Sequence, residues 1–252
     1  LRASAANALE VARLGRLGPS VHASFEVLDR DRIHQLRRYG DAARATSTPV
    51  LLIPPLMLTA EIYDVSPELS AVAALTGRGL DTWLIDFGAP ERVEGGMTRT
   101  LDDHVRAVSR AVDRIRELTG RDVHLVGYSQ GGMFAYQAAA YRRADGIASI
   151  VTFGSPVDIH KSVPNLSSDV VAVLTRAARP LVTAPLARIE GLPGVLTSTG
   201  FKILTPRKEI EQLVDFVRKL HDREALERRE TRRRFLGGEG FVSWPGPALR
   251  TF

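Results

Sequence analysis

One hexapeptide limits what this chain can fold into more than any other segment: GYSQGG, residues 127–132. It follows the short apolar run 123–126, which is typical of a buried strand, and precedes the Ala-rich, helix-like segment 133–144. A serine between glycines at a strand-to-helix turn is exposed on a tight turn, where a nucleophile can be presented to a substrate. The pattern therefore predicts that Ser129 is the catalytic nucleophile of such an elbow.

The neighbours of Ser129 have separate expected roles. Gly127 and Gly131 complete the elbow, because a tight turn has no room for side chains. An acyl carbonyl attacked by serine becomes an oxyanion, which needs backbone N–H donors. We expect the first donor to be Gln130 and the second to follow the strand 50–53, where two prolines carry no N–H and leave Leu56 or Met57. We take Leu56 as the expected donor.

The elements around this turn alternate between strand and helix, which favours the α/β class with a mostly parallel sheet and flanking helices. A hairpin is expected over residues 22–39. The expected apolar strands are 50–53, 82–86 and 122–127, and a further strand is expected over 147–153. The clearest helix begins at a capping-box pattern, Thr100 to Asp103, and ends at Gly120.

The alternation stops after residue 160, which divides the chain into three expected parts. Residues 1–21 form a lead-in helix, residues 22–160 an incomplete α/β-hydrolase core, and residues 161–252 an inserted helical cap or lid. The cap is expected to contain a helix that begins at Thr205-Pro206 and ends near Leu220. The C-terminal part of the fold is expected to be missing.

Composition excludes several other classes. The chain has 252 residues, no cysteine and a formal charge of +5, of which +4 comes from residues 218–234. Charges in that stretch are spaced as on a solvated helix face, with Glu224 before Arg228 and Glu230 before Arg234, and nothing resembles a nucleic-acid motif. No transmembrane segment, metal site or cofactor is expected.

Several segments together resemble the polyhydroxyalkanoate synthase (PhaC-type) branch of the α/β-hydrolase superfamily. They span residues 25–158 in order and are FEVLDRDRIHQLRRY, PVLLIPPLM, GLDTWLIDFGAP, TLDDHV, GYSQGG and TFGSPVD. The synthases carry cysteine where this chain has Ser129. A serine ester is more stable than a cysteine thioester, so water or a lipid alcohol becomes the more natural acyl acceptor than a growing polyester.

The resemblance also implies a chain order of nucleophile, then aspartate, then histidine. Residues 130–252 show no late-strand aspartate or Gly-His loop, so both groups are expected beyond Phe252. The histidines at 22, 34, 104 and 124 are expected to be structural or surface residues. His160 and His221 are the alternatives if the chain is complete.

We therefore expect a serine ester hydrolase, lipase-like or esterase-like, or an acyltransferase, acting on long-chain lipid esters or acyl thioesters through an acyl-serine. The alternatives are synthase-like polymerisation of hydroxyacyl-CoA and a non-catalytic lipid-binding module. Expected partners are a lipid or acyl-CoA-type substrate and, by resemblance to lipase/acyl-CoA synthetase fusion proteins, a fused acyl-CoA synthetase domain. The expected location is cytoplasmic, including the periphery of membranes or lipid bodies.

Overall fold

The computed structural model describes most of the chain. The described residues are 22–41, 49–158, 161, 167–186, 189–204, 211, 214–223, 226–227, 231 and 234–251, with 4, 7 and 9 near the start. The expected lead-in helix over residues 1–21 and the start of the expected helix at 205 therefore lie outside the described residues. So do Glu224, Arg228 and Glu230, although the neighbouring pair Arg223 Nε and Glu227 Oε1 is 2.9 Å apart at helical spacing.

The centre of the molecule is a six-stranded sheet in the order β1-β2-β6-β3-β7-β8. Its strands β3, β6, β7 and β8 are parallel, and the hairpin β1-β2 joins β6 in antiparallel fashion. The bounds are Phe25–Arg30 (β1), Gln35–Tyr39 (β2), Val50–Ile53 (β3), Thr82–Asp86 (β6), Val123–Tyr128 (β7) and Ile147–Phe153 (β8). The mostly parallel sheet, the hairpin and the positions of the strands expected from the sequence are thus confirmed, and most residues of β8 are exposed.

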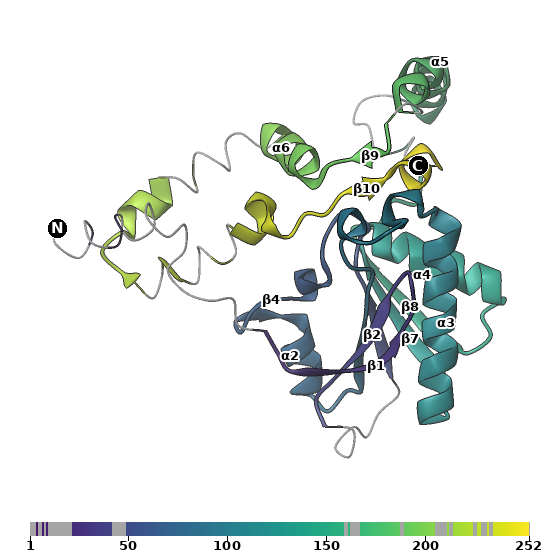
Figure 1. Ribbon diagram of the computed structural model, residues 1–252, viewed down its shortest axis with the longest axis vertical. Helices are drawn as coiled ribbons and strands as arrows, with labels where there is room; N and C mark the ends of the chain where they lie inside the picture. Colours follow the sequence, from purple (N-terminus) through teal and green to yellow (C-terminus); the bar gives the residue numbers. More distant parts are fainter. Residues whose placement is uncertain are drawn as a thin grey trace.

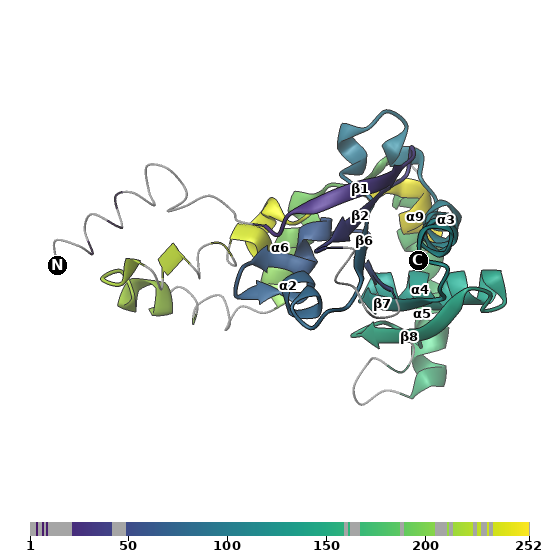
Figure 2. The same cartoon turned by 90° about the horizontal axis from the view of Figure 1, so that it is seen from below.

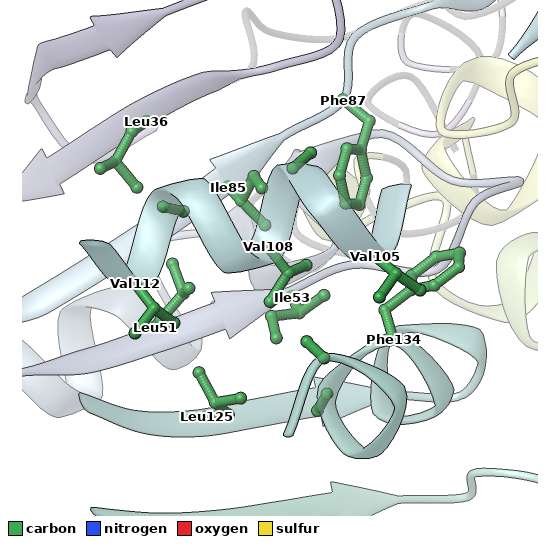
Figure 3. Packing of buried hydrophobic residues seen from close by; sticks show 14 of the residues in the cluster. Leu36, Leu51, Ile53, Ile85, Phe87, Val105, Val108, Val112, Leu125 and Phe134 are labelled. Atoms are coloured by element: carbon green, nitrogen blue, oxygen red, sulfur yellow. The ribbon is translucent and has the colours of Figure 1, made fainter. Parts of the chain in front are cut away.

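Each face of the sheet buries alternate side chains of the same strands. Leu51 and Ile53 of β3 lie in the larger buried cluster, with residues of α3 (Leu101–Thr119) and α4 (Gln130–Arg142) (Figure 3). Val50 and Leu52 point to the other face, which α2 (Ala71–Thr76) covers. Because both faces are covered, β3 is apolar throughout, as expected for a central parallel strand.

The helix α3 begins and ends where the sequence predicts. The Thr100 hydroxyl accepts a hydrogen bond from the Asp103 N–H (3.1 Å), and the Asp103 carboxylate accepts one from the Thr100 N–H (2.9 Å). Gly120 follows the last turn in the left-handed conformation, with φ of 68°. The capping box and the glycine stop are therefore confirmed.

The remaining elements lie mainly at the carboxyl ends of the parallel strands (Figures 1 and 2). The segment after β8 contains α5, β9, α6, η6, β10 and the short helix α9. Helix α9 packs against the core, because Ala248 is fully buried in the same cluster as Ile53. The bounds are η2 (Ala60–Tyr63), β4 (Asp64–Ser66), β5 (Leu69–Ser70), η3 (Pro90–Arg92), η4 (Gly96–Thr98), α5 (Ser168–Leu186), β9 (Gly191–Leu192), α6 (Gly194–Leu204), η6 (Phe235–Glu239), β10 (Trp244–Pro245) and α9 (Gly246–Thr251).

No helix within the described residues is both long enough and apolar enough to cross a membrane.

Candidate active site

Ser129 occupies the turn between β7 and α4 in a backbone conformation that non-glycine residues rarely adopt. Its φ is 53° and its ψ is −121°. Such a conformation costs about 1–3 kcal/mol and persists only where the surroundings hold it. Here the Ser129 N–H donates to the carbonyl O of Phe153 (2.8 Å), and its own carbonyl O accepts from the Gly132 N–H (3.0 Å). The half-buried serine is therefore held at the tip of a fixed, strained turn.

The glycines after Ser129 allow two close approaches. A Cβ on Gly131 would lie 1.9 Å from the carbonyl O of Ile53, and one on Gly132 would lie 1.9 Å from Ser155 Oγ. Both separations are far below van der Waals contact. The start of α4 can therefore pack directly against the end of β3 and the turn after β8 only because both positions are glycine.

The loop that leaves β3 is hydrogen-bonded to the elbow by a side chain. The Leu56 N–H donates to Oε1 of Gln130 at 3.1 Å, and both residues are buried. The N–H of Leu56, the expected second oxyanion donor, is thus directed at the side chain of Gln130, the expected first donor. The backbone N–H of Gln130 lies in the first turn of α4, where N–H groups have no intrahelical acceptor.

The other N–H groups of this loop can be accounted for one by one. Pro54 and Pro55 have none, and the Leu58 N–H donates to the Pro55 carbonyl (3.3 Å). The Thr59 N–H donates to the Gly240 carbonyl (2.8 Å). In the part of the chain that the structure describes, the Met57 N–H alone among residues 56–59 has no acceptor.

Residues 240–242 hold the outer side of the same loop. Leu58 forms an antiparallel bridge with Phe241, and the Met57 carbonyl accepts from the Val242 N–H (3.0 Å). Nothing in the sequence around Phe241 indicated this contact, because it joins positions more than 180 residues apart. The segment expected to form the cap therefore touches the proposed oxyanion loop directly.

Tyr63 fixes the base of the site, and sequence reasoning missed it. Its buried hydroxyl donates to the Ile53 carbonyl (2.9 Å) and lies 3.3 Å from the Val126 carbonyl. Burial raises the pKa of this phenol well above its usual value, so it stays protonated and can donate. The last residue of β3 and the carboxyl-terminal half of β7 are thereby held together just before the loop and the elbow.

A buried charge cluster lies where β6 ends. Asp86 Oδ2 accepts from Gln35 Nε2 (2.6 Å) and from the guanidinium of Arg37, which also donates to Glu61 (3.0 Å). Burial lowers the pKa of Arg37, but Asp86, Tyr39 and Glu61 together outweigh burial and leave that pKa raised. Asp86 thus holds the hairpin and η2 in place, in line with its expected position at a strand end.

The histidines described by the structure are engaged elsewhere. Within the described residues, the Ser129 hydroxyl makes no hydrogen bond to any of them. His221 is exposed and His160 lies outside the described residues. The bonded partners are the Asp64 carbonyl for His22, the Thr100 carbonyl for His104 and the Ser149 hydroxyl for His124, and His34 Nδ1 lies 3.0 Å from the Asp31 carboxylate.

The described residues contain no group of three His, Asp or Glu side chains arranged to hold a metal ion.

Comparison with known proteins gives one family match that covers most of the chain. A model described as "Alpha/beta hydrolase family" matches residues 50–251. Among curated proteins, the poly(3-hydroxyalkanoate) polymerase subunit PhaC of Allochromatium vinosum is 32% identical over 142 residues, covering 56% of this chain and 39% of that protein. The PhaC subunit of Cupriavidus necator is 26% identical over 160 residues, covering 58% of this chain and 27% of that protein.

The chain thus spans less than half the length of these two relatives. A solved structure that resembles it is the Francisella virulence factor BioJ, with a TM-score of 0.44 and 16% identity over 71% of this chain and 64% of that chain. A monoacylglycerol lipase from Paleococcus ferrophilus has a TM-score of 0.37 and 17% identity over 58% of this chain and 51% of that chain. The expected α/β-hydrolase relationship and the similarity to PhaC are confirmed.

Proposed function

Because this chain belongs to the alpha/beta hydrolase family, we propose that it cleaves or transfers the acyl group of lipid esters or acyl thioesters through an ester on Ser129. The observation that carries the proposal is the backbone of Ser129, with φ of 53° at a strand-to-helix turn. A strained conformation of this kind is kept where it presents a reactive group. Two neighbouring N–H groups, in the first turn of α4 and in the β3 loop, have no acceptor among the described residues, which supports the same chemistry.

The reaction would proceed in two steps. Ser129 Oγ attacks the acyl carbon and loses its proton to a base, and the carbonyl oxygen becomes an oxyanion held by backbone N–H groups. The C–O or C–S bond to the leaving group then breaks, and the leaving alkoxide or thiolate takes a proton. Water or an alcohol attacks the acyl-serine by the same route and releases the product.

The substrate class follows from the surroundings of the oxyanion loop. The start of α6 packs closely on Phe241, since a Cβ on Gly194 would lie 2.9 Å from its backbone. The next residues of α6, Val195 and Leu196, are 73% and 57% exposed. Exposed apolar side chains beside a site favour apolar ligands. A long acyl chain is therefore the substrate feature that we propose.

The test is covalent labelling together with turnover. In the full-length protein, Ser129 should react with a fluorophosphonate, and p-nitrophenyl esters should be hydrolysed with kcat/KM rising from acetate to longer acyl chains. Ser129→Ala should abolish both, because removing a triad member costs several orders of magnitude in rate (~10⁴-fold). Ser155→Ala is the matched control, since its hydroxyl is buried after β8 and makes no hydrogen bond in the described structure.

Labelling at another residue, or undiminished hydrolysis by Ser129→Ala, would contradict the nucleophile assignment. Absence of labelling in the folded full-length protein would favour a lipid-binding module instead.

Polymerisation of hydroxyacyl-CoA is a second candidate, because the relatives named above are poly(3-hydroxyalkanoate) polymerase subunits. The chain has no cysteine, so a polymerisation would have to pass through serine esters. Incubation with 3-hydroxybutyryl-CoA distinguishes the two functions: free hydroxy acid supports hydrolysis, and insoluble polyester supports polymerisation.

A further inference from the structure

The side chain of Gln130 joins the two halves of the proposed oxyanion site. Gln130 is the first residue of α4 and only 4% exposed. Its Oε1 reaches across to the β3 loop and accepts the Leu56 N–H at 3.1 Å. The two segments are also in direct backbone contact, because Gly131 lies against the Ile53 carbonyl. A buried side-chain amide at the elbow is therefore used to hold the neighbouring loop.

This hydrogen bond decides which amide of the loop is left for a substrate. A backbone N–H that makes no hydrogen bond within the protein is available to a ligand, and Met57 is only half-buried. Leu56, Leu58 and Thr59 each have an acceptor, and Met57 has none in the described structure. The carbonyl of Met57 is meanwhile held by the Val242 N–H. The peptide that carries the free N–H is thus fixed on both sides.

We propose that the Gln130 side chain is a positioning residue that takes up the Leu56 N–H and so presents the Met57 N–H as the second oxyanion donor. The proposal rests on the function proposed above and replaces Leu56 by Met57 in that role. The opposite role, in which Gln130 Oε1 competes with an oxyanion for the Leu56 N–H, is the alternative that the test distinguishes. The two roles predict opposite effects when the acceptor is removed.

The experiment is Gln130→Met, which keeps the length and helix compatibility of the side chain but removes the amide acceptor. Gln137→Met is the matched control, because Gln137 lies on the same helix and is half-buried. With a p-nitrophenyl ester as the probe, Gln130→Met should lower kcat by about 100-fold, the scale expected for misplacing a catalytic group. KM should be unchanged, because the lost interaction forms only in the transition state. Gln137→Met should leave both kcat and KM unchanged.

A kcat that is unchanged or raised in Gln130→Met would overturn the proposal, and a raised kcat would identify Gln130 as a competitor. Amide hydrogen exchange on the unsubstituted protein gives a second measurement that needs neither turnover nor a variant. The Leu56 amide should exchange more slowly than the Met57 amide, and the reverse order would overturn the proposal. A protein without Ser129-dependent turnover would refute the proposed function, while the exchange order would still decide whether Gln130 holds Leu56.

Discussion

The buried imidazole of His104 shows how one residue can set the pH range of stability. It is fully buried in α3, stacked on Phe134 at 5.5 Å and edge-on to Phe87 at 4.9 Å between ring centroids. Its Nδ1 lies 2.6 Å from the Thr100 carbonyl, while Nε2 has no partner among the described residues. Burial lowers the pKa of His104 to about 4.

We predict that stability falls as pH drops from about 6.5 to about 4. In this window the unfolded chain binds a proton on this histidine and the folded protein does not, so protonation favours unfolding. A shift from the ordinary pKa of 6.5 to about 4 corresponds to about 3 kcal/mol, at 1.36 kcal/mol per pKa unit. Below about pH 4 both states are protonated, and this contribution is constant.

Urea unfolding of the wild type and of His104→Phe at several pH values measures the effect. The aromatic replacement keeps the ring packing and removes the proton, so the free energy of unfolding should depend less on pH between 4 and 6.5. The pKa of the buried His34 is lowered in the same direction. His34 is present in both proteins and leaves their difference unaffected. If the free energy of unfolding depends on pH identically in the wild type and in His104→Phe, His104 is not the group responsible.

For single residues, the sequence predicted the features that depend on local spacing. Ser129 at a strand-to-helix turn, with glycines around it, follows from the order of residue types. The hydrogen bond of the Leu56 N–H does not, because its acceptor is the Gln130 side chain, 74 positions further along the chain. Tyr63 was missed for the same reason: a buried tyrosine that bonds strand ends looks in sequence like any core aromatic residue.

The elbow geometry depends on the close contact between α4 and the turn after β8. Gly132 approaches Ser155 so closely that an added Cβ would lie 1.9 Å from its Oγ and 2.8 Å from its Cβ. Gly131 instead faces the Ile53 backbone. A Cβ on Gly132 would therefore clash with a side chain that can be removed. A Cβ on Gly131 would clash with the backbone of β3, which cannot move without changing the sheet.

We predict that Gly132→Ala lowers the free energy of unfolding and that adding Ser155→Gly restores part of the loss. Overpacking costs about 1–3 kcal/mol in well-packed cores. Removal of Ser155 loses no hydrogen bond, because its Oγ has no partner in the described structure. Ser155→Gly should not restore the stability lost in Gly131→Ala.

A double-mutant cycle of unfolding free energies measures the coupling. Additive effects of Gly132→Ala and Ser155→Gly would contradict the packing described.

Elements with strong periodicity and end signals were predicted closely, and the rest were not. The helix from Thr100 to Gly120 combines a capping box, an apolar stripe and a glycine stop, so its limits follow from local chemistry. The short helix α9 was not expected. Its six residues carry no helical pattern, and it forms where Ala248 is buried against the core.

The sheet of the whole molecule has two edges of very different character. The edge strand β1 carries Glu26, Asp29 and Arg30 and has a register irregularity between Val27 and Asp29. Charges and bulges of this kind discourage pairing with another chain. The opposite edge strand β8, IASIVTF, has no charge, and nearly all of its residues are exposed. In the described structure its outer backbone edge has no strand partner.

We predict that this 252-residue chain self-associates through β8 and that Val151→Lys weakens the association. Val151 is 43% exposed, so a lysine there can reach solvent without entering the core. Its charge would repel the same strand of a second molecule, since like charges on paired strands are destabilising. Val27→Lys on β1 is the matched control, because Val27 is 37% exposed on an edge that already carries charges.

Sedimentation velocity over a range of concentrations tests this prediction. The wild type and Val27→Lys should both sediment faster as concentration rises, and Val151→Lys should stay closer to the monomer at every concentration. The fold should be unaffected, because both substitutions lie on exposed positions of edge strands, where surface changes usually cost within about 0.5 kcal/mol. Equal concentration dependence in all three proteins would refute β8 as the association surface. A wild type that is monomeric throughout would show that the exposed apolar edge is tolerated without pairing.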